Sequence, residues 1–127
     1  MDTGGTTSVF IVAKPGRLRD SLRAMLRTAS YLKIVGQADD TTTAISPLSQ
    51  FQPDLLLVGT NLSAASVTQL VLATKSCSPH TRCMVLVDNL EQMWQATAAG
   101  ADSVLLAGFP STTFFSAIDG LRLQTNA

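Results

Sequence analysis

The stretch Asp54-Leu55-Leu56-Leu57-Val58-Gly59-Thr60-Asn61 decides the fold of this chain. Four apolar residues in succession, between an aspartate and a glycine, predict a strand that is covered on both faces. The run Ser8-Val9-Phe10-Ile11-Val12 has the same character. Doubly covered strands are typical of a parallel sheet that lies between two layers of helices.

Helical patterns alternate with the apolar runs along the chain. We expect strands at residues 8–12, 32–38, 55–58, 84–87 and 103–106. The first expected helix has apolar residues at helical spacing, Leu18, Leu22, Met25 and Leu26, and its arginines are expected to form a solvated face. Further helices are expected at 40–50, 63–75, 89–99 and 112–123. Five βα units in series predict right-handed crossovers and a doubly wound α/β sheet.

Three residues set the expected ends and shape of these helices. Asp40 is a suitable N-cap, and Gly100 is a suitable C-terminal cap. Pro47 lies inside the second helix, which we therefore expect to be kinked or short.

Length and charge indicate one domain with no general affinity for polyanions. The 127 residues suit a single core, at 8–124, between a flexible lead-in at 1–7 and a tail at 125–127. Nine basic residues balance nine acidic ones, so no overall field favours nucleic acid or an anionic membrane. No apolar run is long enough to span a membrane and no signal peptide is present, so the cytosol is the expected compartment.

The two cysteines and the single histidine do not make a convincing metal site. Cys77, His80 and Cys83 have suitable spacing but provide three ligands and no fourth. We interpret both cysteines as ordinary thiols, with Cys83 in the core of a strand, and expect no metal and no other cofactor.

Four short motifs follow one another in this chain with nearly gapless spacing. They are Val35-Gly36-Gln37-Ala38, Gln52-Pro53-Asp54-Leu55-Leu56-Leu57, Ala99-Gly100-Ala101-Asp102, and Leu105-Leu106 with Pro110. In this order they resemble V-G-E-A, R-P-D-V-V-L, A-G-A-D and L-L-K-x-x-P in the receiver domains of NarL-like response regulators, and the resemblance covers residues 8–122. The resemblance implies a flavodoxin-like (βα)5 fold with strand order 2-1-3-4-5. It also implies bacterial two-component signalling and a phosphorelay.

The positions that carry receiver chemistry are all altered in this sequence. The family uses an acidic pair and an aspartate to bind Mg²⁺, with the aspartate as phosphoacceptor, and a Thr or Ser and a Lys to bind the phosphoryl group. The matching residues here are Ala13, Lys14, Gly59, Val87 and Ala107. No Mg²⁺ is therefore expected, and Lys14 places a positive charge where the metal would lie. Asp88 and Asn61 lie near the same edge, but neither is placed to replace the nucleophile.

The parts of a receiver that move on phosphorylation are altered as well. Val104 stands at the position of the switch aromatic, and the stretch 87–100 is about two residues shorter than the resemblance implies. Considered alone, Gly59 has another reading, a tight turn in an unrelated α/β protein.

Four large side chains are candidates for an interaction surface. They are Met93, Trp94, Phe114 and Phe115. Met93 and Trp94 equally suit a buried helix face. Phe114 and Phe115 are adjacent on a helix and cannot both face the core, so Phe115 is the expected contact residue. The resemblance implies a cis peptide bond between Phe109 and Pro110.

These observations favour a phosphorylation-independent pseudo-receiver that acts as a protein-interaction or dimerisation module. We expect a homodimer through the last helix with helix one or helix four, or another protein partner, and contact with DNA only through an output domain. The alternative is a small-ligand-binding domain that uses the vacated pocket. We expect no enzymatic activity, because His80 is the only histidine and lies on the opposite edge of the sheet.

Overall fold

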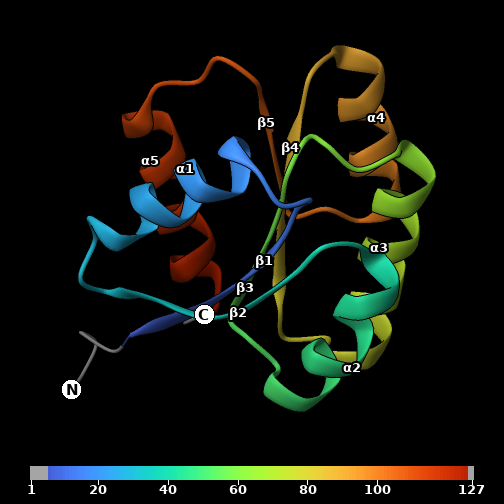
Figure 1. The fold of residues 1–127 in the computed structure, drawn as a ribbon, viewed down its shortest axis with the longest axis horizontal. Coiled ribbons are helices and arrows are strands. Elements are labelled where there is room, and N and C mark those ends of the chain that lie inside the picture. The colour runs from blue at the N-terminus through green and yellow to red at the C-terminus, as the bar shows by residue number, and fades with distance from the viewer. Residues whose placement is uncertain (1–5, 126–127) are drawn as a thin grey trace.

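A single parallel sheet forms the centre of the protein, whose structure is a computed structural model that describes residues 6–125 (Figure 1). Its strands lie in the order β2-β1-β3-β4-β5. Their bounds are β1 (Thr7–Val12), β2 (Leu32–Ala38), β3 (Leu55–Val58), β4 (Arg82–Val87) and β5 (Ser103–Leu106). This order confirms the predicted fold class.

Helices cover both faces of the sheet. Figure 1 shows α1 (Arg17–Arg27) and α5 (Ser111–Thr125) on one side, and α2 (Thr41–Phe51), α3 (Ala64–Cys77) and α4 (Leu90–Ala99) on the other. The strand β1 alternates between the two layers, because Val9 and Ile11 belong to one apolar core while Phe10 and Val12 belong to the other. Both faces of the central strands are therefore buried, as their apolar runs predict.

Local capping explains where α2 and α4 begin and where α4 ends. The carboxylate of Asp40 accepts a hydrogen bond from the Thr43 N–H at 2.9 Å, and Asn89 caps α4 in the same way through the Gln92 N–H. Gly100 closes α4 with a φ of 110°, in the left-handed region that suits glycine. The helix α2 continues past Pro47 to Phe51.

The observed boundaries differ from the prediction in a few places. Thr7, placed in the lead-in, is the first residue of β1, and α5 reaches Thr125, while residues 1–5 and 126–127 lie outside the described part. The strand β4 begins at Arg82, two residues earlier than expected, because Arg82 pairs with Leu55 in the parallel ladder. The peptide bond between Phe109 and Pro110 is trans, so the expected cis bond is wrong.

Phe114 and Phe115 differ in burial, as expected for adjacent residues on a helix. Phe114 is fully buried in the core that α1 and α5 share, so the prediction that it contributes to an interaction surface is wrong. Phe115 is half-buried and packs edge-on against Phe114, with ring centroids 5.3 Å apart. Phe115 thus keeps an accessible part but mainly supports the core.

Candidate functional site

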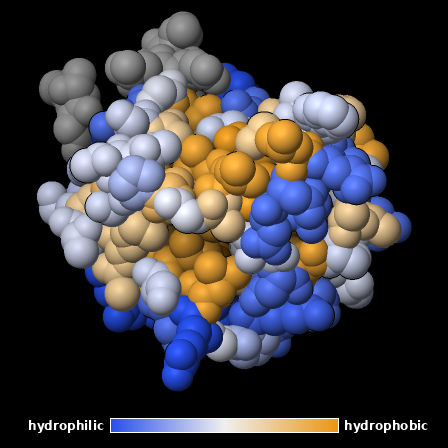
Figure 2. All heavy atoms as spheres, turned by 90° about the horizontal axis from the view of Figure 1, so that it is seen from above, coloured by the Kyte–Doolittle hydropathy of each residue, from blue (hydrophilic) through white to orange (hydrophobic). Residues whose placement is uncertain are grey.

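The five positions that the resemblance matches to receiver chemistry meet at the carboxyl ends of the strands, where open α/β sheets place their sites. Ala13 and Gly59 lie side by side after β1 and β3, and Gly59 and Val87 line one pocket. The Ala107 N–H donates to the Val87 carbonyl at 2.7 Å. Figure 2 looks onto this end of the molecule, where apolar residues gather in the middle of the face and hydrophilic residues lie around them.

Gly59 has no room for a side chain. A Cβ added there would lie 2.9 Å from the Cβ of Ala13, 3.1 Å from Cδ2 of Leu18 and 3.5 Å from Oδ1 of Asn61. Contacts as short as the first do not occur between real Cβ atoms, so a neighbour would have to shift. The φ of Gly59 is not positive, so the glycine meets a need for space and not for a tight turn.

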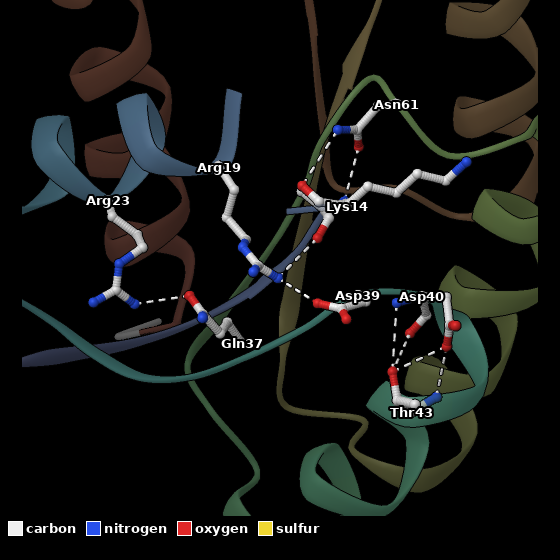
Figure 3. Close-up of polar contacts among 9 residues, drawn as sticks. Lys14, Arg19, Arg23, Gln37, Asp39, Asp40, Thr43 and Asn61 are labelled. Atoms are coloured by element: carbon white, nitrogen blue, oxygen red, sulfur yellow. Dashed lines mark hydrogen bonds and ion pairs between the residues drawn. The ribbon is translucent and has the colours of Figure 1, made fainter. Parts of the chain in front are cut away.

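An amide side chain fastens the two loops beside Gly59. The Lys14 N–H donates to Oδ1 of Asn61 at 3.1 Å, and Nδ2 of Asn61 donates to the Lys14 carbonyl at 3.5 Å (Figure 3). Asn61 therefore joins the loop after β1 to the loop after β3 through the backbone of Lys14. The Lys14 side chain is exposed and, in Figure 3, extends away from Arg19 and Asp39.

Arg19 is a second cation at this site, and the sequence analysis missed it. Its Nη1 donates to the Ala13 carbonyl at 3.2 Å and to Asp39 at 2.5 Å, and its side chain is only 13% exposed. The sequence predicts a solvated helix face for Arg19, because nothing in the spacing of the arginines separates it from its neighbours. Arg19 ties the start of α1 to the ends of β1 and β2.

None of the five altered positions provides an oxygen ligand or a nucleophile. Receiver chemistry requires carboxylates for the metal and for phosphoryl transfer. Asp88 follows β4 but is exposed, and the bond described for it is from its backbone N–H to Oε1 of Gln92 at 2.7 Å. The site therefore has an apolar centre, with the cation of Lys14 and the ion pair of Arg19 and Asp39 beside it.

A small pocket lies beside Gly59, between α3 and α4. Leu62, Val85 and Val87 give it an apolar floor, and Gln92 and Gln95 add amide groups. Its volume of about 20 Å³ has room for about one water molecule. Ligand pockets are typically about 300–1,000 Å³, so this space is too small for a metabolite.

The predicted switch position and two of the four predicted surface residues, Met93 and Trp94, lie on the α4 side of the sheet. Val104 and Met93 are half-buried against the core that α2, α3 and α4 cover, whereas Trp94 is 71% exposed. Leu90, four residues before Trp94 on α4, is 57% exposed, and Leu106 at the end of the edge strand β5 is 41% exposed. We call Leu90, Trp94 and Leu106 the α4–β5 surface; the sequence analysis missed its two leucines.

The structure does not assemble the cysteines and the histidine into a metal site. Within residues 6–125, no group of three or more His, Cys, Asp or Glu side chains is placed to hold a metal ion. Burial of Cys83 raises the pKa of its thiol to about 12, which keeps it protonated. Among the described helices, none has the length and apolar character needed to cross a membrane.

Solved receiver domains have the same fold as this chain. The receiver domain of the response regulator NarL from Mycobacterium tuberculosis is 21% identical, with a TM-score of 0.82 over 94% of this chain and 98% of that one. A LuxR-family two-component response regulator from Aurantimonas sp. SI85-9A1 has a TM-score of 0.84 at 15% identity, over 94% of this chain and 87% of that one. The RcsB receiver domain of Salmonella enterica serovar Typhimurium has a TM-score of 0.80 at 17% identity, over 94% of this chain and 90% of that one.

One curated relative is similar in sequence. The Fimbriae Z protein of Salmonella typhimurium is 30% identical over 97 residues, which is 75% of this chain and 46% of that protein. This chain thus spans about half the length of that relative. No family model matches the sequence.

Proposed function

We propose that this chain is a phosphorylation-independent pseudo-receiver that acts as a protein-interaction or dimerisation module in signal transduction. The observation that carries the proposal is the closed space at Gly59, where Ala13 and Leu18 occupy the volume of an acceptor side chain. The apolar residues at the other positions support the same conclusion. In a longer gene product, a DNA-binding output domain would connect this module to transcription.

Hydrogen bonds between the segments around Gly59 also favour a module that does not switch. Asn61 and Arg19 join the segments around the former site by hydrogen bonds to backbone atoms of Lys14 and Ala13. Val104 provides no aromatic ring that could rotate inward. We therefore infer one stable conformation, with regulation through the presence of a partner.

A phosphorylation assay tests this proposal. The protein is treated with acetyl phosphate and Mg²⁺, and separately with beryllofluoride and Mg²⁺, next to a receiver domain that retains its aspartate. We expect no mass gain in this protein and no chemical-shift change around Gly59, whereas the control should respond. A stoichiometric phosphoryl adduct would overturn the proposal.

The α4–β5 surface is the contact region that we propose for the partner. Isolated exposed apolar side chains are ordinary on protein surfaces, but larger apolar patches mark interaction sites. Of the two helices proposed to join α5 in a homodimer, exposure of Leu90 and Trp94 favours α4. A pocket of about 20 Å³ gives no support to the alternative that this domain binds a small ligand. A metabolite that raised the melting temperature of the protein would support that alternative.

A further inference from the structure

A wide groove lies between α1 and the outer edge of β2, away from the former phosphorylation site. Its volume is about 510 Å³. The helix contributes Arg23, Leu26 and Arg27, and the strand contributes residues 32–37. Leu26 is fully buried and Leu32 is 8% exposed, so the floor of the groove is apolar.

The groove concentrates positive charge in a chain that has no net charge. Arg23, Arg27 and Lys33 line it, and no Asp or Glu is among its lining residues. Arg23 donates to an uncharged group, Oε1 of Gln37, at 2.8 Å (Figure 3). Across the described chain, neither Arg27 nor Lys33 takes part in an ion pair.

The strand that borders the groove has a free edge. Within residues 6–125, β2 is the outermost strand and pairs only with β1, so no described strand pairs with its other edge. An extended peptide can add to such an edge through main-chain hydrogen bonds. Lys33 lies on this edge strand, and its charge opposes pairing with a second copy of β2. The same positive charge attracts a peptide strand that carries acidic side chains.

The spacing of the cations matches an extended chain. The hydrogen bond from Arg23 to Gln37 fixes one end of the groove, and the short turn from α1 to β2 places Arg27 near the Lys33 end. Arg23 and Arg27 are one helical turn apart, roughly 6 Å along the axis. Alternate residues of a strand repeat at roughly 6.6 Å on the same face.

We propose that this groove binds an acidic peptide in extended conformation, which adds to β2 as a sixth strand. Its acidic side chains alternate in the sequence, so that successive carboxylates on the α1 side reach Arg27 and Arg23. Guanidinium groups bind carboxylates through paired hydrogen bonds, which gives this register its specificity. The proposal is independent of the proposed loss of phosphorylation.

Binding of a fluorescein-labelled peptide in which Glu alternates with Thr and Val tests this inference by fluorescence anisotropy. The combined substitutions Arg27→Glu and Lys33→Glu should weaken binding by about tenfold or more, because charge-assisted bonds become repulsive contacts. Arg17→Glu is the matched control for Arg27→Glu alone, because Arg17 is an exposed arginine of α1 outside the groove and its substitution should leave affinity unchanged. Equal weakening by Arg17→Glu would show a general charge effect and overturn the proposal.

A second peptide separates strand addition from simple attraction between charges. Replacing the central Thr by Pro keeps the charge but removes a main-chain donor, so its affinity should fall by about tenfold. Hydrogen exchange of β2 should slow when the first peptide binds. Undiminished binding of the proline peptide, unchanged exchange in β2, or no binding of either peptide would each overturn the proposal.

Discussion

Gly59 lacks both an acceptor carboxylate and the space for one. We predict that Gly59→Asp stays unphosphorylated by acetyl phosphate, because the metal ligands and the lysine are still absent. The same variant should lose about 1–3 kcal/mol of unfolding free energy, since its Cβ must displace Ala13 or Leu18. Urea unfolding and intact mass measure the two outcomes.

Two alanine variants isolate the steric part of this prediction. Gly59→Ala should be destabilised without adding any charge. Gly120→Ala places its methyl group on α5 with nothing within 4 Å, so it should be neutral or stabilise the protein by up to about 1 kcal/mol. If Gly59→Ala were as stable as the parent, the close approach of Ala13 would be wrong.

The two thiols differ in burial, and this predicts how stability depends on pH. Burial raises the pKa of Cys83 to about 12 from an ordinary value of 9.0. Between these values the unfolded chain binds fewer protons than the folded one, so the unfolding free energy should fall as pH rises above about 9. Burial also raises the pKa of Tyr31, which acts in the same direction.

A cysteine variant assigns this alkaline loss to Cys83. We expect the unfolding free energy of Cys83→Ala to fall less steeply with pH. This variant lacks the thiol that loses its proton more readily in the unfolded than in the folded chain. Cys77 is half-buried, so it is more accessible than Cys83. In the folded protein a thiol reagent should modify Cys77 first. Identical slopes for Cys83→Ala and the parent would contradict this assignment.

Asp102 connects three elements near the start of β5, and its loss should destabilise all of them together. Its Oδ2 accepts from Nζ of Lys75 on α3 at 2.6 Å and from the backbone N–H of Cys83 on β4 at 2.8 Å. Hydrogen bonds to a charged group contribute about 1.5–3 kcal/mol each, so Asp102→Ala should cost about 2–4 kcal/mol in chemical denaturation. Asp39→Ala is the comparison, since the Asp39 side chain is 60% exposed and should cost less than about 1 kcal/mol. Equal losses in the two variants would contradict this role for Asp102.

The elements that could be predicted from the sequence are those specified by local chemistry. Asp40 and Asn89 mark helix starts because a side-chain oxygen caps the backbone a few residues away, and Gly100 marks an end through its own backbone. The earlier start of β4 depends on Arg82 pairing with β3, which no local pattern encodes. The crowding at Gly59 and the contacts of Arg19 likewise arise from segments that meet only after folding.

Across the whole molecule, the fold is that of solved receiver domains, whereas the five positions matched to receiver chemistry hold no carboxylate and no hydroxyl group. Both core layers keep the apolar periodicity that places Phe10 and Ile11 on opposite faces of the sheet. At the carboxyl ends of the strands, the positions matched to carboxylates hold Ala13, Lys14 and Gly59, and Arg19 is paired with Asp39 beside them. Such a molecule can communicate through its surfaces, and its apolar and its basic surfaces lie on opposite edges of the sheet, at β5 and β2.

Self-association through the α4–β5 surface is the prediction that concerns the whole molecule. If two copies meet there, the single tryptophan, Trp94, becomes buried, and its emission should shift to shorter wavelength as protein concentration rises. Light scattering should then report a dimer for the parent and a monomer for Leu90→Glu. Leu72→Glu is the matched control, because Leu72 is 55% exposed on α3, close to the 57% of Leu90, and lies outside this surface.

The same measurements distinguish the other partners. A parent that stays monomeric at all concentrations would rule out the homodimer and leave another protein as the occupant of the α4–β5 surface. A dimer that survives Leu90→Glu but dissociates with Ser21→Glu on the exposed side of α1 would place the interface on α5 and α1. Because a charge buried without a partner is strongly unfavourable in an apolar contact, each substitution should abolish only the interface to which it belongs.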